Sequence, residues 1–434
     1  MKAKIRKCRS CKGAVTMPGD KSISHRSAIV ASLADGCSEI TNYAPSDDCL
    51  STLSVLSDLG VEWKKSGSDL TVEGRGRTGF VEPKNVLDCG NSGTTMRLMC
   101  GLLAGQPFFS VLTGDESLRS RPMARVIEPL RTMGAVIHGR SGDRFAPLCI
   151  RGCRLSGTSY TMPVASAQVK SALLLAGLFA EGCQTVIEKE LSRDHTERML
   201  DYFGVSVSRE GGAVTVCGEY RPEARKLSIP GDISSAAFFL VLGTLAGEGM
   251  RLEDIGVNPT RTGILSYLEA SGAPVTLTNQ RLFCNEPVAD LEPVKGKIMG
   301  CGIGEGLIPL LIDELPVIAV AACFASGRTT VTGAAELRVK ETDRISAVCT
   351  ELRKMGASID ELKDGFVVDG PCALHGAECF SHGDHRIAMA LTIAGLMAEG
   401  ETVISGAECV SISFPGFFES VAKVCGYEAI TIEK

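Results

Sequence analysis

The sequence predicts an α/β protein of six similar units of about 70 residues, paired as two domains of three units. Two glycine markers lead to this prediction, because each occurs six times and the two alternate along the chain. Stretches rich in strand-forming residues, such as Phe109–Thr113 and Thr329–Thr332, fall between the predicted helices. Each unit therefore mixes strands with two helices.

The first marker is an apolar helical stretch that ends near Leu-Ala-x-Gly and precedes a β-rich run. Its glycines are Gly36, Gly105, Gly182, Gly249, Gly327 and Gly400. We expect each of them to take the left-handed conformation that ends a helix. The second marker is a helix that ends in a glycine directly before a strand, at Gly60, Gly134, Gly204, Gly272, Gly356 and Gly426.

Local signals place some helix starts and one chain break. Asp47 and Asp48 precede a predicted helix over Leu50–Leu59, and Arg121 with Pro122 opens one over Met123–Met133. A Pro-Gly pair punctuates the chain at Ser228–Gly231. The first three units then fill residues 19 to 228.

Composition excludes several classes of protein. The chain has 434 residues, with 45 Lys and Arg against 51 Asp and Glu, a net charge of −6. Nucleic acids and anionic membranes attract a basic excess, so neither is an expected partner. The apolar run Leu307–Ala325 contains two acidic residues and two prolines, and the N-terminus lacks the apolar segment of a signal peptide. We interpret the 18 cysteines as reduced, small hydrophobic residues of a cytoplasmic protein.

The sharpest motif is Pro18–Arg26, which reads Pro-Gly-Asp-Lys-Ser-Ile-Ser-His-Arg. A turn delivers Lys21 and Ser22 to a predicted helix N-terminus, with Arg26 about one turn further on. Free backbone N–H groups, a hydroxyl and two cations form a receptor for an anion. The alternative is an ordinary capped helix with surface charges.

Two more stretches resemble entries into helices. Asp88–Thr95 contains Asn91 and Gly93, and Gly93 lets a ligand approach the backbone closely. Arg119 and Arg121 stand just before a predicted helix, which suits an anion. Taken alone, each stretch is better explained without a ligand, the first by a common Gly-Asn-Ser turn and the second by a solvated charge pair.

Hydroxyl, amide and charged groups also precede two later helices. Ser166, Ala167 and Gln168 lead into the apolar helix Ala172–Leu178, where they either bind a polyol or phosphate or only cap the helix. Arg193 lies in Ser192–Glu197, which could likewise be no more than a helix start.

Two acidic residues stand where they could transfer protons. Asp313 interrupts an apolar run, and a carboxylate there is costly unless it is paired or functional. Glu341 lies between Lys340 and Arg344, which a helix would place on one face as i,i+4 neighbours. A helix N-cap at Asp313 and a salt-bridged surface helix around Glu341 are the alternatives.

The stretch Ser381–Arg386 offers two histidines and an aspartate, but the chain supplies no further ligands at metal-site spacing, so no metal is expected. A turn that delivers Arg386 to an anion is preferred. Basic residues thus recur at the entries of several units, and they could line one cleft between the two domains. They are Lys21, Arg26, Arg121, Arg193, Lys340, Arg344 and Arg386.

With these motifs, the whole chain resembles the 5-enolpyruvylshikimate-3-phosphate synthase family. The most specific stretches are Pro18–Arg26, Gly90–Thr94, Arg338–Arg344 and Asp384–Arg386. The resemblance implies two domains, each of three βαβαββ repeats in an inside-out, barrel-like α/β arrangement, with the active site in the cleft between them. It assigns residues 19–228 to one domain, and residues 1–18 with 229–434 to the other.

The resemblance also implies a reaction. The family transfers the enolpyruvyl group of phosphoenolpyruvate to the 5-hydroxyl of shikimate 3-phosphate by addition and elimination, on the shikimate pathway to chorismate and aromatic amino acids. No metal or cofactor takes part. Both substrates are anionic, so many cations are required to hold them side by side. A cytoplasmic monomer that binds only these small molecules is expected.

The resemblance assigns roles residue by residue. Asp313 is expected to be the base on the 5-hydroxyl, Glu341 the proton donor and acceptor at the methylene carbon, and Lys21 an aid to proton transfer. Shikimate 3-phosphate would contact Lys21, Ser22, Arg26, Ser166, Ala167, Gln168, Arg193, Asp313 and Lys340. Phosphoenolpyruvate would contact Lys21, Asn91, Gly93, Arg121, Gln168, Arg344 and Arg386.

Two positions depart from the family pattern. Ile412 stands where some members have a lysine that touches phosphoenolpyruvate, and Glu336 stands where some have asparagine. Gly93 bears on inhibition, because glyphosate occupies the phosphoenolpyruvate site in the family and an alanine there crowds it. The sequence therefore predicts a glyphosate-sensitive enzyme.

Two other functions compete with this reading. UDP-N-acetylglucosamine enolpyruvyl transferases share the repeat architecture but use a loop cysteine, which Gly114–Arg121 lacks, and have asparagine in place of Ser22. A non-catalytic binding scaffold would not need Asp313, Glu341 and all the cations.

Overall fold

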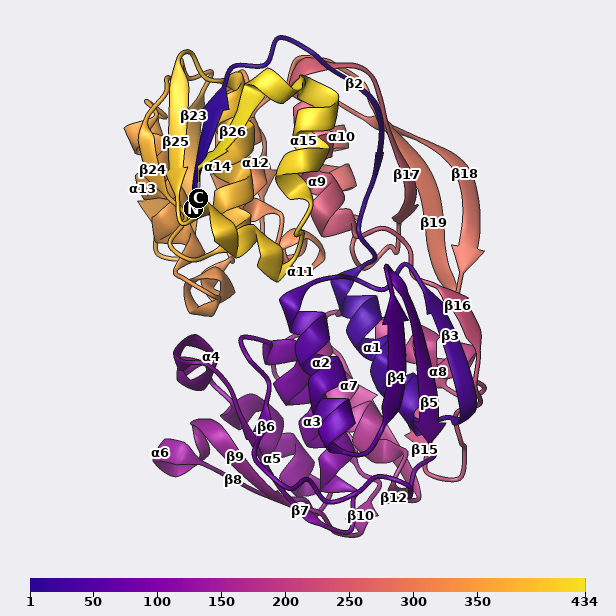
Figure 1. The fold of residues 1–434 in the computed structure, drawn as a ribbon. Coiled ribbons are helices and arrows are strands. Elements are labelled where there is room, and N and C mark those ends of the chain that lie inside the picture. Colours follow the sequence, from indigo (N-terminus) through magenta and orange to yellow (C-terminus); the bar gives the residue numbers. More distant parts are fainter. Residues whose placement is uncertain (434) are drawn as a thin grey trace. The chain divides into compact units, whose positions relative to one another are not determined.

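The computed structural model describes residues 1–433, which divide into two compact units (Figure 1). The inserted unit comprises Gly19–Ile229 and the short segment Leu282–Glu286. The terminal unit comprises Met1–Pro18, Pro230–Arg281 and the described residues from Pro287 onward. No sequence marker pointed to Leu282–Glu286, which the sequence had left with the second domain.

One strand order recurs in six four-stranded sheets. In the sheet β6 (Leu87–Asp88), β7 (Phe109–Thr113), β9 (Phe145–Arg151) and β8 (Val136–Gly139), the first pair is parallel and the other two pairs are antiparallel. The helices α3 (Gly93–Ala104) and α5 (Ala124–Thr132) join β6 to β7 and β7 to β8. The predicted βαβαββ repeat is therefore confirmed, and among residues 1–433 no sheet closes into a barrel.

The inserted unit holds three of these sheets. The other two are β16 (Lys226–Ser228), β3 (Asp35–Thr41), β5 (Asp69–Arg75) and β4 (Glu62–Ser66), and β11 (Ser159–Thr161), β13 (Cys183–Ile187), β15 (Ala213–Cys217) and β14 (Ser208–Glu210). A small parallel pair, β10 (Leu155–Ser156) and β12 (Ala180–Glu181), accompanies them. The remaining helices are α1 (Lys21–Leu33), α2 (Asp47–Asp58), α4 (Glu116–Ser120), α6 (Arg140–Asp143), α7 (Ala167–Gly177) and α8 (His195–Tyr202).

The terminal unit holds the other three sheets. They are β18 (Val275–Phe283), β19 (Glu286–Pro293), β17 (Gly247–Gly256) and β2 (Cys11–Thr16); β20 (Gly302–Ile303), β21 (Gly327–Val331), β23 (Gly365–Gly370) and β22 (Ile359–Leu362); and β24 (Glu378–Phe380), β25 (Glu401–Ser405), β1 (Lys2–Arg6) and β26 (Ile430–Glu433). Its helices are α9 (Ile233–Ala246), α10 (Gly263–Ala270), α11 (Ile308–Leu311), α12 (Leu315–Cys323), α13 (Arg344–Lys354), α14 (His385–Met397) and α15 (Phe417–Cys425). Three short 3₁₀ helices are η1 (Ala335–Val339), η2 (Ala407–Ile412) and η3 (Tyr427–Ala429).

Two edge strands, β2 and β16, lie where the chain crosses from one unit to the other. Strand β2 pairs in parallel with β17, although α1, which follows β2, belongs to the inserted unit. Strand β16 pairs in parallel with β3, although α9, which follows β16, belongs to the terminal unit. Each unit thus completes a sheet with the strand that the chain forms just before leaving it.

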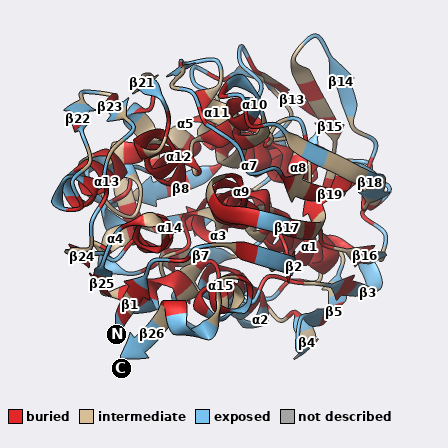
Figure 2. Ribbon diagram, turned by 90° about the horizontal axis from the view of Figure 1, so that it is seen from above, coloured by how far each residue is buried: buried red, intermediate tan, exposed pale blue. Residues whose placement is uncertain are grey.

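The first helix of each repeat is buried on nearly all sides. In the terminal unit α9, α12 and α14 pack against one another, and they are drawn almost wholly in the buried colour in Figure 2. In the inserted unit α3 packs against α1 and α7 in the same way. A helix that is apolar all round belongs in a core, so the polar groups of these helices gather at their N-termini, where the predicted motifs lie.

The second glycine marker behaves as predicted. All six glycines have positive φ, and each directly follows a helix end. After α2, for example, the N–H of Gly60 donates to the carbonyl of Ser57 and that of Val61 to the carbonyl of Leu56, at 2.9 and 3.0 Å. This pair of bonds is the Schellman motif, which satisfies the last carbonyls of a helix.

The first glycine marker was interpreted correctly in backbone conformation but wrongly in position. Five of its six glycines have positive φ, and Gly105 does not. Helix α1 ends at Leu33, and Gly36, with φ +101°, lies inside β3 rather than at the helix C-cap. Gly105 is a C-cap, but its φ is −93°. This marker lies where a core helix is followed within a few residues by a strand, as α1 is followed by β3.

Two helix starts differ from the predictions. Helix α2 begins at Asp47, because the hydroxyl of Ser46 caps it by accepting from the N–H of Cys49 at 3.3 Å. Helix α5 begins at Ala124, two residues after Pro122, and carries Pro129 inside it. The predicted helices exist, and only their first residues are displaced.

The cysteines are not all reduced. Cys183 and Cys217 face each other on β13 and β15 and form a disulfide. The interpretation of every cysteine as a free thiol is therefore wrong for this pair. Cys49, Cys100 and Cys349 are buried free thiols, as expected. Within residues 1–433 no helix is long and apolar enough to cross a membrane, and no cluster of three or more His, Cys, Asp and Glu could hold a metal.

Candidate active site

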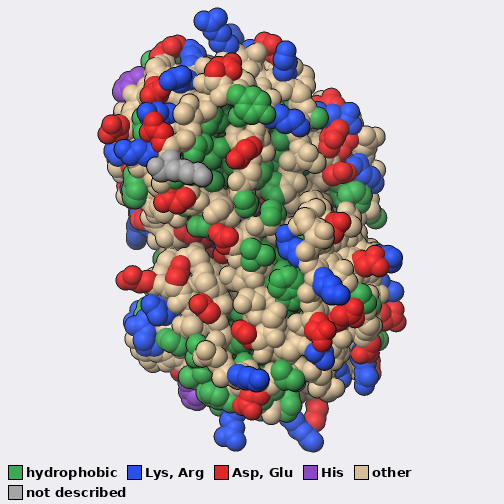
Figure 3. Space-filling view, viewed as in Figure 1, with side chains coloured by type: hydrophobic (Ala, Val, Ile, Leu, Met, Phe, Trp, Pro, Cys, Tyr) green, Lys and Arg blue, Asp and Glu red, His purple; other side chains and the backbone are tan. Residues whose placement is uncertain are grey.

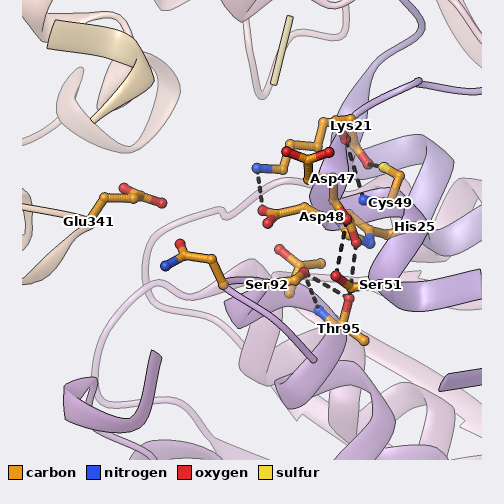
Figure 4. Close-up of polar contacts among 12 residues, drawn as sticks. Lys21, His25, Asp47, Asp48, Cys49, Ser51, Ser92, Thr95 and Glu341 are labelled. Atoms are coloured by element: carbon orange, nitrogen blue, oxygen red, sulfur yellow. Dashed lines mark hydrogen bonds and ion pairs between the residues drawn. The ribbon is translucent and has the colours of Figure 1, made fainter. Parts of the chain in front are cut away.

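The Pro18–Arg26 motif forms the N-terminus of α1. Asp20 caps the helix by accepting from the N–H of Ile23 at 2.9 Å. Lys21 follows and forms an ion pair with Asp48 at the start of α2 (Figure 4). The cation therefore stands at a helix N-terminus, where the helix dipole also favours an anion.

Arg26 is buried one turn further along α1. Its guanidinium donates to the hydroxyl of Thr196 and to the hydroxyl of Ser171, both at 2.7 Å, and to the carbonyl of Ser22 at 2.9 Å. Burial lowers the pKa of Arg26 to about 10, so the group stays charged at neutral pH. These contacts fix Arg26 beside Ser22 and join α1 to α7 and α8.

Asn91 and Arg121, both predicted to contact phosphoenolpyruvate, contact each other. Arg121 donates to the amide oxygen of Asn91 at 2.7 Å and to the hydroxyl of Ser117 at 3.2 Å. The amide nitrogen of Asn91 donates to Asp115 at 2.6 Å. Arg121 is thus held by side chains of α4 and of the turn before α3.

Gly93 is the first residue of α3, and a buried arginine covers it. A Cβ built on Gly93 would lie 2.8 Å from Nη1 of Arg97 and 3.4 Å from Nη1 of Arg121. Arg97 in turn donates to Gln168 at 2.7 Å, and Gln168 donates to the hydroxyl of Thr94 at 3.0 Å. Sequence reasoning missed Arg97, although a charge inside the apolar helix of Thr95–Leu103 was a usable signal.

A second buried cation was also missed. Lys170 on α7 forms ion pairs with Glu188 at 2.6 Å and Glu197 at 2.7 Å, and all three side chains are about 1% exposed. Burial raises the pKa of Glu197, although Lys170 opposes the shift. Lys170 also donates to the carbonyl of Ser192 at 3.2 Å, so it anchors the segment that carries Arg193.

A chain of hydroxyl groups links α1 to the entry of α3. Nδ1 of His25 and the hydroxyl of Thr95 each lie 2.6 Å from the hydroxyl of Thr52. Thr95 then donates to the hydroxyl of Ser92 at 2.7 Å (Figure 4). Burial, together with the charges of Lys21 and Arg26, lowers the pKa of His25 well below its ordinary value, so this residue is neutral.

The terminal unit gathers its predicted residues around Arg344, the first residue of α13. The guanidinium donates to Asp384 at 2.7 Å, to Glu341 at 2.6 Å and to Asp313 at 3.3 Å. Burial opposes the charge of Arg344, but the three carboxylates outweigh it and raise its pKa above the ordinary value. Arg344 is therefore a permanent cation that holds both predicted proton-transfer groups.

Asp313 lies in the turn between α11 and α12, among cations. Its Oδ1 is 3.6 Å from Nζ of Lys340 and 4.0 Å from Nε of Arg386, beside the contact with Arg344. Asp384 caps α14 by accepting from the N–H of Arg386 at 2.8 Å. The predicted alternative of an N-cap role for Asp313 is wrong, because Glu314 occupies that position of α12.

One predicted detail differs in the terminal unit, and two contacts were not predicted. Lys340 and Arg344 are not neighbours on one helix face, because Lys340 is the extended C-cap of η1 and Arg344 begins α13. Nε2 of His382 donates to Glu351 at 2.8 Å. Ile412 packs against the apolar core of the unit, as its side chain allows.

Comparisons with known proteins show which family the chain belongs to. Residues 5–421 match the family model described as EPSP synthase (3-phosphoshikimate 1-carboxyvinyltransferase). The chain belongs to this family. The family predicted from the motifs is confirmed, and with it the expectation of an enolpyruvyl transfer enzyme with small-molecule substrates.

Individual relatives match over their full length. A 3-phosphoshikimate 1-carboxyvinyltransferase from Pelotomaculum thermopropionicum is 53% identical over 423 residues, 97% of this chain and 98% of the relative. One from Bacillus cereus is 51% identical over 413 residues, 95% and 96% of the two chains. The structure of an EPSP synthase from Acinetobacter baumannii is similar with a TM-score of 0.88, at 42% identity and full coverage of both chains. An enolpyruvyl transferase from Streptomyces tendae, at 16% identity, 98% and 97% coverage and a TM-score of 0.77, shares the fold.

Proposed function

We propose that this chain transfers the enolpyruvyl group of phosphoenolpyruvate to the 5-hydroxyl of shikimate 3-phosphate and releases phosphate. This is the 3-phosphoshikimate 1-carboxyvinyltransferase reaction (EC 2.5.1.19) of the shikimate pathway, supported by the family and by the relatives at about half identity. The observation that carries the proposal is the Arg344 group, in which one buried cation holds both Asp313 and Glu341 among further cations.

The substrates demand cations, and each unit supplies a group of them. Shikimate 3-phosphate is bound by Lys21, Ser22, Arg26, Ser166, Ala167, Gln168, Arg193, Asp313 and Lys340. Phosphoenolpyruvate is bound by Lys21, Asn91, Gly93, Arg121, Gln168, Arg344 and Arg386. Charge-assisted bonds to phosphate and carboxylate oxygens are strong and directional, which suits two small anions that must be held in register. That both groups face one cleft remains the prediction made from the sequence.

The reaction needs one proton to leave an oxygen and another to reach a carbon. Asp313 accepts the proton of the 5-hydroxyl as the oxygen bonds to C2 of phosphoenolpyruvate, and Glu341 donates a proton to C3. In the second step phosphate leaves C2 and takes up the proton that Asp313 had accepted. A proton returns from the methyl carbon C3 to Glu341, which restores the double bond. Lys21 assists these transfers. Positioned acids and bases of this kind contribute about 10²–10⁴-fold to a rate.

The expected partners are these small molecules alone, bound by a cytoplasmic monomer without nucleic acid or membrane. Figure 3 supports the exclusion of a polyanionic partner on the face that it draws, because Lys and Arg side chains are interspersed there with Asp and Glu. Transfer to a UDP-sugar is disfavoured because Gly114–Arg121 has no cysteine.

Release of inorganic phosphate tests the proposal directly. Purified protein is incubated with phosphoenolpyruvate and shikimate 3-phosphate, with each substrate alone, and with UDP-N-acetylglucosamine in place of shikimate 3-phosphate. Phosphate release only with the first pair supports the proposal. Release only with the UDP-sugar, or no release from folded protein, overturns it.

A further inference from the structure

Glu314, the residue after Asp313, carries a second carboxylate, which contacts different residues. Glu314 is fully buried, whereas the side chain of Asp313 is 15% exposed and lies among cations. One oxygen of Glu314 accepts a hydrogen bond from the hydroxyl of Ser234, at the start of α9. The other, Oε2, has no hydrogen-bond partner among the described residues. The mechanism above gives Glu314 no role.

Ser234 belongs to a buried polar group that fixes the N-terminus of α9. Arg261 donates to the hydroxyl of Ser234 at 2.6 Å and lies 3.4 Å from Asp232. Asp232 caps α9 by accepting from the N–H of Ser234 at 3.0 Å and from the hydroxyl of Ser235 at 3.1 Å. The hydroxyl of Ser234 is therefore oriented by Arg261, which leaves its proton directed to Glu314.

Glu314 is also the N-cap of α12. Its N–H donates to the carbonyl of Leu311, and its carbonyl accepts from Val317 and Ile318, at 2.9 to 3.1 Å. The backbone of Glu314 thus belongs to both α11 and α12, and its side chain ties this turn to α9. Because Asp313 is the preceding residue, any shift of Glu314 moves the Asp313 carboxylate as well.

The unfavourable burial of the Glu314 carboxylate indicates that this side chain has a role. Burying a carboxylate with one oxygen unpaired is unfavourable unless other contacts compensate. A neutral residue could occupy the N-cap of α12 at lower cost. Active-site groups must be held to within about half an ångström, and residues that lock their backbone provide that precision.

We propose that Glu314 is a positioning residue, which fixes the Asp313 carboxylate by binding the α11–α12 turn to Ser234 at the N-terminus of α9. The inference rests on the proposed role of Asp313 as the base. Glu314 itself touches no substrate and exchanges no proton in the reaction.

Steady-state kinetics of four variants test the proposal. Glu314→Ala removes the tie and should lower kcat by roughly 10- to 10²-fold, because a displacement of about 1 Å has an effect of that size. Glu314→Gln keeps an oxygen that accepts from Ser234 and should retain kcat within about threefold. Ser234→Ala removes the donor and should lower kcat, whereas Ser235→Ala, on the same turn but bonded to Asp232, should not. The KM for shikimate 3-phosphate should change little.

A double variant separates positioning from general damage. If Glu314 acts through Asp313, the Asp313→Ala, Glu314→Ala double variant is no slower than Asp313→Ala alone. Two results overturn this inference and leave the proposed function standing. One is a double variant whose loss of kcat is the product of the two single losses. The other is a wild-type kcat in both Glu314→Ala and Ser234→Ala while Asp313→Ala is impaired. An inactive wild-type protein contradicts the proposed function itself. An Asp313→Ala variant with wild-type activity contradicts the role of Asp313. If Glu314→Ala does not fold, the contrast of Ser234→Ala with Ser235→Ala decides.

Discussion

Arg344 donates to Glu341 at 2.6 Å through the same guanidinium that binds Asp384 at 2.7 Å and Asp313 at 3.3 Å. One buried guanidinium thus binds both proposed proton-transfer groups and Asp384, the N-cap of α14. Each carboxylate is oriented by a cation, so the base and the acid are placed before any substrate binds. Preorganisation of this kind lowers the free energy needed to reach the transition state.

Replacing Arg344 should therefore damage stability as well as activity. Arg344→Met leaves three carboxylates around a neutral side chain, and breaking a buried ion pair in this way costs about 3–5 kcal/mol of the free energy of unfolding. Denaturant unfolding followed by circular dichroism measures the loss. Arg328→Met is the control, because Arg328 pairs with Asp369 at the surface and should unfold like the wild type. Equal stability of both variants would contradict the role given to Arg344.

Asp313→Ala and Glu341→Ala should each lower turnover by at least about 10²-fold, the usual contribution of a general acid or base. Binding of shikimate 3-phosphate, measured by calorimetry, should remain detectable because the cations of the inserted unit are untouched. Asp369→Ala removes an exposed carboxylate of β23 and serves as the control. Wild-type rates in both active-site variants would remove the assignment of the two roles.

Gly93→Ala should weaken inhibition by glyphosate and raise the KM for phosphoenolpyruvate. The added Cβ would stand 2.8 Å from Nη1 of Arg97, so the guanidinium must shift, and Arg121 beside it has little room. Inhibition constants and KM values of the variant and the wild type measure the effect. Gly302→Ala, whose Cβ meets nothing within 4 Å, is the matched control. The prediction fails if the inhibition constant is unchanged.

Local signals account for what the sequence could predict. The Schellman glycines, the caps at Asp20 and Ser92 and the motifs beside them depend on contacts within a few residues, and these are readable without tertiary structure. Repetition of the glycine signals six times then fixed the number of units. The first residue of α2 was missed because serine and aspartate can both cap a helix.

Long-range partners could not be predicted in the same way. Arg97 meets Gln168, which is 71 residues away, and Glu314 meets Ser234 at a separation of 80 residues. The Cys183–Cys217 disulfide depends on the register of β13 and β15, which spacing alone does not determine. Arg97, Lys170 and Glu314 do share one signal, a charged residue beside or within an apolar run of the sequence, and this signal indicates burial without identifying the partner.

Glu351 makes the stability of the terminal unit depend on pH. This carboxylate is buried, and burial alone would raise its pKa. Hydrogen bonds from Lys354, His382 and the N–H of Phe380 outweigh burial and lower the pKa below its ordinary value of 4.5. A carboxyl group whose pKa is lowered by folding stabilises the protein above its unfolded pKa, and this stabilisation is lost as the pH falls through the folded value.

Glu351→Gln removes this contribution and should lower the thermal midpoint at pH 7. The difference between wild type and variant should shrink as the pH is lowered from about 5 towards 3, because the wild-type carboxyl group then takes up a proton. Thermal unfolding of both proteins at several pH values measures the difference. Asp369→Asn, at an exposed ion pair, should show only a small difference at every pH. Since Glu351 holds His382, which precedes Asp384 and Arg386 by two and four residues, Glu351→Gln should also raise the KM for phosphoenolpyruvate. A midpoint difference that stays constant down to pH 3 would contradict the lowered pKa.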